Sequence, residues 1–234
     1  MSGRLTGRTA LISGGARGQG AAVVIGDVLE AEGEAHAAAL RAAGHSVHFL
    51  RLDVTRPDDW SAAVGAAEER FGRLDVVVNN AGIVRIAPMA EETDDGWSRT
   101  MAVNATGVFY GMRAAIPALR RAGGGSIINV ASIYGPVGAP GYVAYTASKG
   151  AVISMTKVAA LEHAHENIRV NAICPGPVRS PMSAEEGYAS VDITPLRRRA
   201  EPHEISAAVA FLASDDAIYI TGAELAIDGG YLAR

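Results

Sequence analysis

The chain has 234 residues, of which 49% are hydrophobic and 20% are charged, and its formal net charge is −4. A chain of this length and composition favours one large globular domain over residues 1–234, which needs neither disulfides nor a metal to hold its core. The negative net charge and the lack of a basic patch argue against nucleic acid as the main partner. Cys174 is the one cysteine, so the chain has no internal disulfide and no cysteine-pair metal site.

No segment has the pattern of a targeting signal or a membrane span. The first residues lack the apolar run of a signal peptide. The longest apolar stretches have the length of strands, far below the roughly 20 residues that a membrane helix needs. Together with the single cysteine, this predicts a cytoplasmic protein without a membrane partner.

Short runs of β-branched residues alternate with longer alanine-rich segments, and the alternation predicts strands and helices in turn. The predicted strands are Thr9–Ser13, Ala22–Gly26, Val47–Leu52, Asp75–Asn80, Ser126–Ser132, Ile168–Ile173 and Glu224–Asp228. The predicted helices are Leu29–Ala43, Arg56–Phe71, a helix capped by Thr93, Tyr142–His165 and Glu201–Ala213.

The ends of two helices carry recognisable stop and start residues. Gly44 and Gly72 follow the first and second helices, where glycine is the usual residue. We expect Thr55 to cap the second helix and Pro57 to lie in its first turn.

Several strands are apolar at consecutive positions, as in VVVNN (76–80) and IINVA (127–131). This pattern is typical of parallel strands that helices cover on both faces. The sequence therefore predicts an α/β fold, a Rossmann-like doubly wound parallel sheet. Sheets of this class bind ligands at the carboxyl ends of their strands.

A glycine-rich stretch follows the first predicted strand. Gly14, Gly18 and Gly20 have the spacing G-x-x-x-G-x-G. Glycines let the backbone approach a pyrophosphate, and amide groups at a helix start point toward its charge. The alternative is an ordinary tight turn without a ligand.

Asp27 stands at the end of the second predicted strand. An acid at this place can accept hydrogen bonds from the adenosine ribose hydroxyls and repel a 2′-phosphate, which favours NAD over NADP. The alternative is that Asp27 merely caps the helix that starts near Leu29.

The junction between these two strands is unusually short. Asp27 follows Gly20 by seven residues, whereas the acid usually lies about 20 residues after the glycines. Only residues 14–21 separate the strands, and a crossover through a helix takes at least about 10–12 residues. Either the natural chain is short here or this sequence lacks residues. With a short junction, a bound pyrophosphate would lack the favourable dipole of a helix. One face of the sheet would also lack its covering helix.

A possible acid–base pair lies in YTASK (145–149). Tyr145 and Lys149 are four residues apart, which puts them on one face of a helix. An ammonium near a phenol favours the phenolate and so tunes it for proton transfer near neutral pH. Ser132 can donate a hydrogen bond to the same substrate oxygen. Taken alone, the pair is also compatible with an ordinary surface helix.

Further motifs follow one another in order. They are NNAG (79–82), Asn104 within MAVNATG, Ser132 placed 13 residues before Tyr145, PGPV (175–178) and YITGAELAIDGG (219–230). With these motifs the sequence resembles the short-chain dehydrogenase/reductase family over essentially its whole length.

The resemblance implies four catalytic roles. Tyr145 would exchange the proton with the substrate oxygen, and Ser132 would orient and polarise that oxygen. Lys149 would bind the nicotinamide ribose and act on Tyr145. Asn104 would hold a water that links Lys149 to solvent.

The resemblance also implies how NAD is bound. Gly14, Arg17, Gly18, Gln19 and Gly20 would form the phosphate loop, and Tyr145 and Lys149 would touch the nicotinamide half. The residues that would surround the adenosine and the carboxamide are Asp27, Asp53, Val54, Asn80, Ala81, Gly82, Pro175, Gly176, Val178 and Ser180.

Three positions and the junction depart from the family pattern. Serine replaces the usual threonine at Ser13 and Ser180, and Gln19 stands where an apolar residue is common. Relatives carry about a dozen more residues after the glycines. The catalytic groups are intact, so the departure bears on cofactor binding.

Within the family, the sequence looks most like bacterial hydroxysteroid and other secondary-alcohol dehydrogenases. Substrate choice is expected in a loop over about 182–199, which can cover an apolar substrate or be a lid without particular shape. Arg197–Arg199 are interpreted as a solvated approach to a helix, with a phosphate-bearing substrate as the alternative.

The sequence therefore predicts an NAD-dependent oxidoreductase that interconverts a secondary alcohol and a ketone, without a metal. One alternative is an NADPH-dependent 3-oxoacyl carrier-protein reductase. The other is a binding or scaffold protein whose short junction impairs cofactor binding. The resemblance further implies a homo-oligomer, commonly a tetramer.

Overall fold

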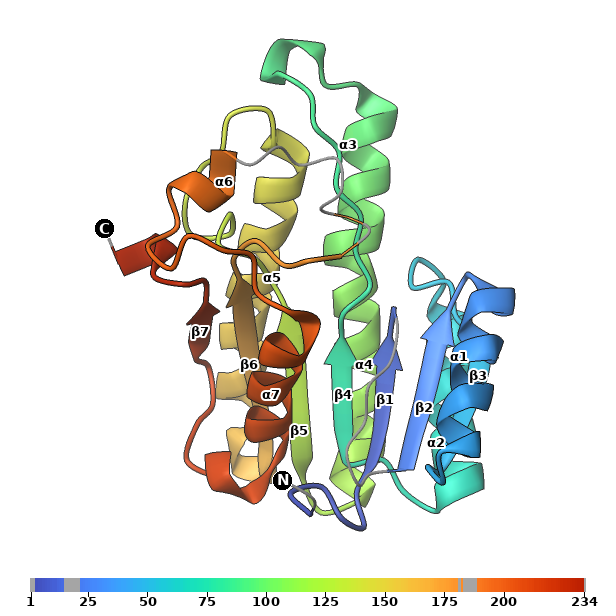
Figure 1. The fold of residues 1–234 in the computed structure, drawn as a ribbon. Coiled ribbons are helices and arrows are strands. Elements are labelled where there is room, and N and C mark those ends of the chain that lie inside the picture. The colour runs from blue at the N-terminus through green and yellow to red at the C-terminus, as the bar shows by residue number, and fades with distance from the viewer. Residues whose placement is uncertain (1–2, 15–21, 181, 183–188, 234) are drawn as a thin grey trace.

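A computed structural model of the chain describes residues 3–14, 22–180, 182 and 189–233. Seven parallel strands form one sheet in the order β3-β2-β1-β4-β5-β6-β7 (Figure 1). The strands are β1 Thr9–Ser13, β2 Ala22–Asp27, β3 Val47–Arg51, β4 Val76–Asn79, β5 Gly125–Val130, β6 Ile168–Pro175 and β7 Glu224–Ile227. The order reverses between β1 and β4, so the predicted doubly wound sheet is confirmed.

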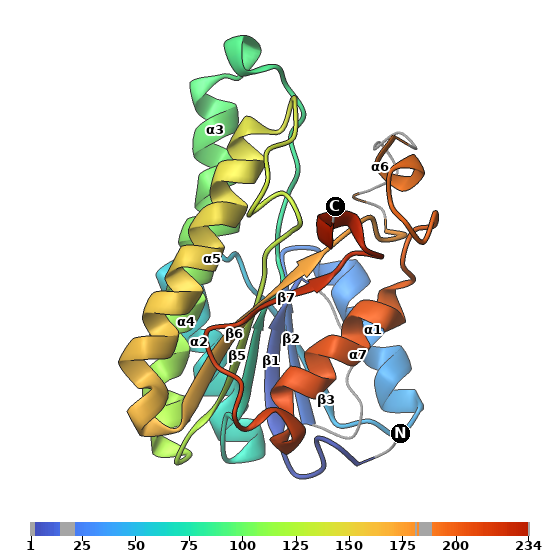
Figure 2. The same cartoon turned by 90° about the vertical axis from the view of Figure 1, so that its left-hand side faces the viewer.

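Helices cover both faces of the sheet (Figure 2). The main helices are α1 Glu30–Ala42, α2 Pro57–Phe71, α3 Asp94–Met101, α4 Gly107–Arg121, α5 Val143–His163 and α7 Pro202–Ala213, and α6 is the short turn Ala189–Asp192. Helices α2, α4 and α5 lie on one face, and α1 and α7 on the other. None of the helices in the described ranges is long and apolar enough to cross a membrane.

Apolar side chains on both faces of the strands hold these layers together. Leu11 and Val77 belong to the core cluster on the α2, α4 and α5 side. Ala10, Val76 and Val78 belong to the cluster on the α1 and α7 side. Consecutive residues of one strand thus enter different cores, which explains the apolar runs in the sequence.

The structure confirms most of the predicted helix ends and corrects one. Pro57 is in the first turn of α2, and Gly72 ends the helix with a left-handed φ of 80°. The N-cap of α2 is Arg56, not Thr55. The Thr55 hydroxyl instead donates to the Asp53 carboxylate over 2.7 Å. Thr93 caps α3 as predicted, since its side chain accepts from the Gly96 amide.

A helix that the sequence did not predict as such follows α3. A π-helical turn over Ala102–Thr106 joins α3 to α4, so the chain stays helical over residues 94–121. The turn carries Asn104, which is fully buried. Single π turns within helices often mark functional sites.

Strands β1 and β2 are adjacent and parallel, with Thr9 opposite Ala22. Eight residues separate them, as the sequence predicts. Gly14 continues the pairing, because its amide donates to the Gly26 carbonyl over 2.8 Å. The other predicted phosphate-loop residues, Arg17, Gly18, Gln19 and Gly20, lie outside the described residues.

The expected substrate loop packs against the C-terminal segment at its far end. Residues 181 and 183–188 lie outside the described part of the chain. The Leu196 amide donates to the Gly229 carbonyl over 3.1 Å, and Thr194 is buried. The C-terminal segment therefore fixes the end of the loop.

Candidate active site

A cavity of about 1380 Å³ lies along the carboxyl ends of the central strands. Its position is the one expected for a ligand site in a doubly wound sheet. The predicted site residues that line it are Gly14, Asp27, Asp53, Val54, Asn80, Ala81, Gly82, Ser132, Tyr145, Lys149, Pro175, Gly176, Val178 and Ser180. The structure thus brings these residues together around one space.

Tyr145 and Lys149 come from the first turns of α5. The Lys149 Nζ atom lies 5.5 Å from the centre of the Tyr145 ring, over its face. The same Nζ donates to the Val130 carbonyl at the end of β5 over 2.7 Å. Burial of the ammonium lowers the pKa of Lys149 to about 8. The lysine therefore titrates close to neutral pH.

Helix α5 places this pair because the neighbouring face of the helix is anchored in the core. Ala144, Ser148 and Val152 are fully buried and recur at helical spacing. With that face against the sheet, Tyr145 and Lys149 turn toward the carboxyl end of β5. The sequence spacing alone predicts the shared face, whereas the direction of the face depends on packing.

Ser132 follows β5 and lines the same cavity, with an exposed fraction of 7%. Its Oγ accepts a hydrogen bond of 3.2 Å from the Tyr134 amide. This bond uses a lone pair of the oxygen and keeps the hydroxyl proton available as a donor. The serine is therefore oriented by backbone and can polarise an oxygen bound in the cavity.

Asn104 does not line the cavity but ties together the elements around it. Its Oδ1 accepts from the Ile83 amide over 2.8 Å, and its Nδ2 donates to the Ile83 carbonyl over 2.9 Å. Nδ2 also donates to the Ser148 hydroxyl over 3.1 Å. Asn104 thus joins the segment after β4 to α5. Its expected role in holding a water remains a prediction.

Gly14 and Ser13 connect the end of β1 to the end of β4. The Ser13 Oγ accepts from the amides of Asn80 and Ala81 over 3.1 and 3.2 Å. The Asn80 side chain donates back to the Gly14 carbonyl over 2.8 Å. A Cβ on Gly14 would lie 2.7 Å from the Ala81 Cα. Serine thus provides here the hydroxyl that threonine usually supplies, and only glycine fits beside it.

Asp27 fits both interpretations that the sequence allowed. Its Oδ1 accepts from the Leu29 amide over 3.1 Å, so it stabilises the start of α1. It also lines the cavity. A carboxylate oxygen has lone pairs for more than one donor, so Asp27 can hold α1 and accept from a ligand hydroxyl together.

Asp53 and Val54 lie after β3, at the cavity edge near Asp27. The Asp53 Oδ1 accepts from the Thr55 amide and hydroxyl over 3.0 and 2.7 Å. These hydrogen bonds lower the pKa of Asp53. The Val54 carbonyl accepts from the Trp60 indole over 3.1 Å, which fixes the turn that presents both residues.

Gly176 brings the ends of β6 and β7 together. A Cβ on Gly176 would lie 2.8 Å from the Asp228 Cα, and its amide donates to the Ile227 carbonyl over 3.0 Å. Pro175, Val178 and Ser180 line the cavity beside it. This segment therefore forms part of the cavity wall.

Other lining residues were not predicted as site residues. The cavity continues over the α1 and α7 face of the sheet, where Ala10, Ile12, Val76 and Val209 line it. The short junction after Gly14 was the feature of the sequence that predicted less helical cover on this face of the sheet. Arg99 and Tyr134 also line the cavity; Tyr134 could have been found from its place two residues after Ser132.

Known proteins resemble this chain in sequence and in structure. A family model described as enoyl-(acyl carrier protein) reductase matches residues 11–232. A crystal structure from Burkholderia xenovorans, assigned to the short-chain dehydrogenases/reductases, superposes with a TM-score of 0.93 at 31% sequence identity, covering 100% of this chain and 99% of that chain. The chain belongs to the short-chain dehydrogenase/reductase family.

Other short-chain dehydrogenases are similar over their full length. A 3-alpha-(or 20-beta)-hydroxysteroid dehydrogenase of Mycobacterium tuberculosis is 48% identical, covering 100% of this chain and 92% of the relative. A trans-4-hydroxycyclohexanecarboxylate dehydrogenase of Sinomonas cyclohexanicum is 47% identical, covering 98% and 95%. A cyclopentanol dehydrogenase of Comamonas testosteroni is 42% identical, covering 99% and 100%.

The first of these alignments also bears on the junction. It extends over 246 positions and takes in all 234 residues of this chain, a difference of twelve. The alignment therefore contains about twelve positions at which the relative has a residue and this chain has none. The difference agrees in size with the shortening expected after the glycines.

Proposed function

We propose that this protein is an NAD(H)-dependent dehydrogenase that interconverts a secondary alcohol, such as a hydroxysteroid, and the corresponding ketone. The observation that carries the proposal is the meeting of Ser132, Tyr145 and Lys149 at one end of a cavity whose wall includes Asp27. The names of the relatives, which are dehydrogenases of hydroxysteroids and cyclic alcohols, support the substrate class.

The described residues fit a nicotinamide dinucleotide. Gly14, with a φ of +73°, lines the cavity and carries no side chain between its backbone and that space. Asp27 would bind the adenosine ribose, Asp53 and Val54 would border the adenine, and Lys149 would bind the nicotinamide ribose. When bound, the cofactor supplies hydride transfer at the nicotinamide ring.

Residues of the chain itself transfer the proton to and from the substrate oxygen. In the oxidative direction, Ser132 donates a hydrogen bond to the substrate oxygen and holds it beside the phenol. Tyr145, as phenolate, takes the hydroxyl proton of the alcohol, and the carbon that bears this hydroxyl loses the hydride that a bound nicotinamide would accept. The Lys149 ammonium favours the phenolate electrostatically. In the reductive direction Tyr145 returns the proton to the ketone oxygen.

The choice of NAD over NADP is assigned to Asp27. Its carboxylate accepts hydrogen bonds from ribose hydroxyls but repels a 2′-phosphate by like charge. The same residue keeps its bond to the Leu29 amide. The carboxylate is therefore held in place before the cofactor arrives.

The test is a substrate and cofactor screen on the purified chain. We expect oxidation of cyclic secondary alcohols to produce NADH, measured by absorbance at the nicotinamide band, with NADP giving much slower turnover. Calorimetric titration with NADH accompanies the screen, because the short junction bears on cofactor affinity. No binding at millimolar NADH would contradict the proposal and favour a scaffold protein.

A second candidate is a 3-oxoacyl carrier-protein reductase, and the description of the matching family model shares with it the carrier-protein substrate but names the reduction of enoyl groups. Such an enzyme would reduce a 3-oxoacyl thioester with NADPH at the same Ser132 and Tyr145. The same screen, run with acetoacetyl thioester and NADPH, separates the candidates. Faster turnover of the thioester than of every alcohol would establish the second.

We also propose that the dehydrogenase acts as one catalytic unit over residues 1–234 and assembles as a homotetramer in the cytoplasm. Exposed apolar side chains support the assembly. Phe109 on α4 and Val158 and Leu161 on α5 are all exposed, Leu161 at 83%. A subunit interface on these helices would bury them. Light scattering of the purified protein gives the molar mass that tests this.

A further inference from the structure

Four tyrosines form a continuous row of rings beside the proposed catalytic groups. The ring centres of Tyr142 and Tyr145 are 6.4 Å apart, and those of Tyr134 and Tyr142 are 5.1 Å apart. Tyr231 follows at 6.3 Å from Tyr134. The interplanar angles of 48–75° are those of tilted and edge-to-face pairs, which aromatic rings prefer. The row therefore joins the C-terminal segment to the catalytic tyrosine.

Within this row, Tyr134 and Tyr145 line the cavity. Tyr134 lies two residues after Ser132, and its amide is the donor that orients the Ser132 Oγ. A substrate whose oxygen is held between Ser132 and Tyr145 therefore has its carbon skeleton within reach of the Tyr134 ring. The ring is only partly buried, so it has apolar surface to offer.

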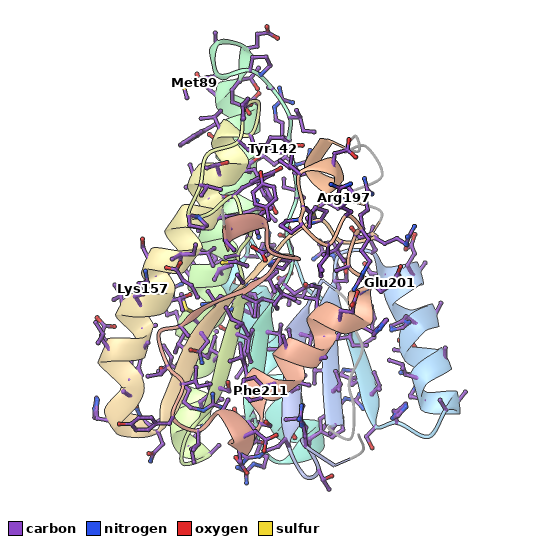
Figure 3. The ribbon with its side chains drawn as sticks, turned by 60° about the vertical axis from the view of Figure 1, so that its left-hand side comes forward. Met89, Tyr142, Lys157, Arg197, Glu201 and Phe211 are labelled. Atoms are coloured by element: carbon purple, nitrogen blue, oxygen red, sulfur yellow. The ribbon has the colours of Figure 1, made fainter. Side chains whose placement is uncertain are left out.

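Two other rings hold the Tyr134 ring in place. Tyr142 lies at the start of α5, at the same end of the molecule as Arg197 of the substrate loop (Figure 3). Tyr231 belongs to a C-terminal turn that Asp228 orders, since its carboxylate accepts from the amides of Gly230 and Leu232 over 2.9 and 2.8 Å. Segments far apart in the sequence thus restrict the motion of one side chain.

The same C-terminal turn is bound to the substrate loop. Gly229 accepts from the Leu196 amide, and Gly230 packs against Pro195. Both glycines have left-handed φ values of 64° and 89°, which permit this close approach. Tyr231 is therefore held on the loop side as well as by Tyr134.

We propose that Tyr134 determines substrate specificity: its ring packs against the face of an alicyclic ring that carries the reacting hydroxyl. Tyr142 and Tyr231 are positioning residues that act through Tyr134. An alicyclic ring presents a flat apolar face and has no rotatable bonds to immobilise, so it gains more from a rigid aromatic wall than an open chain does. This inference rests on the proposed function and deepens it.

The test compares cyclohexanol with 2-hexanol, two secondary alcohols with six carbons each. The variants are Tyr134→Ala, Tyr134→Leu and the matched control Tyr134→Phe, which keeps the ring. All three keep the backbone amide that binds Ser132. We expect the ratio of kcat/KM for cyclohexanol to that for 2-hexanol to fall about tenfold in the Ala and Leu variants, mainly through KM, and to change less than about threefold in the Phe variant.

Tyr231→Leu tests the positioning role. We expect a smaller loss of the same ratio, about threefold, with unchanged NADH affinity and a kcat for 2-hexanol close to that of the wild type. An unchanged ratio in both Tyr134→Ala and Tyr134→Leu, with each variant folded by its melting temperature, overturns the inference while leaving the proposed function intact. Wild-type protein that binds NADH but oxidises neither these alcohols nor any cyclic alcohol or hydroxysteroid of the screen overturns the proposed function and this inference with it.

Discussion

The Lys149 Nζ atom lies over the face of the Tyr145 ring, 5.5 Å from its centre, and is fastened to the Val130 carbonyl by a 2.7 Å hydrogen bond. The bond to β5 fixes the ammonium relative to the sheet, and the helix fixes the phenol relative to the ammonium. Charge and proton donor are thereby held on rigid elements rather than on loops. Such placement favours a stable geometry for proton transfer.

Replacing Tyr145 by Phe removes the hydroxyl and keeps the ring that faces Lys149. We expect kcat for alcohol oxidation to fall by about 10²–10⁴-fold or more, the usual contribution of a positioned acid–base group. NADH affinity, measured by calorimetry, should stay within about threefold, since the ring and Lys149 are retained. A variant that keeps a tenth of the wild-type kcat would refute the role of Tyr145.

The buried amine should make stability depend on pH. Because the pKa of Lys149 is lowered to about 8, the folded state binds this proton more weakly than the unfolded state, whose pKa is about 10.4. The resulting penalty is fully present below pH 8 and disappears as the pH rises toward 10.4. We therefore expect Lys149→Met to unfold at higher denaturant concentration than wild type at pH 7, with the difference shrinking by pH 10. A difference that does not change with pH would contradict this account.

The carboxylate of Asp27 should set the cofactor preference. We expect wild type to favour NAD over NADP by about 10²-fold in kcat/KM, because like charges placed together cost several kcal/mol. Asp27→Asn removes the charge but keeps an oxygen that can accept from the Leu29 amide. This variant should lower the preference by about tenfold without lowering the melting temperature. Comparable kinetics with both cofactors in wild type would overturn the assignment.

Gly14 and Gly65 form a matched pair for a stability test. Gly14→Ala places a Cβ 2.7 Å from the Ala81 Cα at a φ of +73°, and we expect a loss of about 2 kcal/mol or more of unfolding free energy. Gly65 lies in α2, and a Cβ added there would meet no neighbour within 4 Å among the described residues. Gly65→Ala should therefore stabilise by about 0.5–1 kcal/mol. Chemical denaturation measures both, and equal effects would show that the close approach at Gly14 is not restrictive.

Sequence patterns predicted the sheet better than the helices around the site. Strand β1 has the predicted bounds because its extended run of residues ends at Gly14, whose left-handed φ of +73° favours glycine. Helix α4 was missed because Gly111 and Pro117 interrupt its pattern. A Cβ on Gly111 would clash with the Asn79 side chain on β4 and with the Trp60 ring at 2.8 Å, so that glycine serves packing against β4 and α2. Helix propensity, which depends on each residue type alone, cannot predict such a tertiary contact.

The site was predictable where chemistry is carried by motifs and not where it depends on packing. Ser132, Tyr145 and Lys149 share one cavity as their order in the sequence indicated. Asn104 lies in the π turn that joins α3 to α4 and bonds to Ile83 and Ser148. This placement depends on how α3 and α4 pack against α5. The same holds for Tyr134, whose direction is set by rings from α5 and the C-terminal turn.

The brief link between β1 and β2 has a consequence for how the chain folds. Thr9 pairs with Ala22, thirteen residues away, whereas Val23 pairs with Val47 and Ala10 with Val76. Closing a smaller loop sacrifices less conformational entropy, and the saving grows with the logarithm of the loop length. The first two strands can therefore meet early and serve as a template on which the later, more distant pairings assemble.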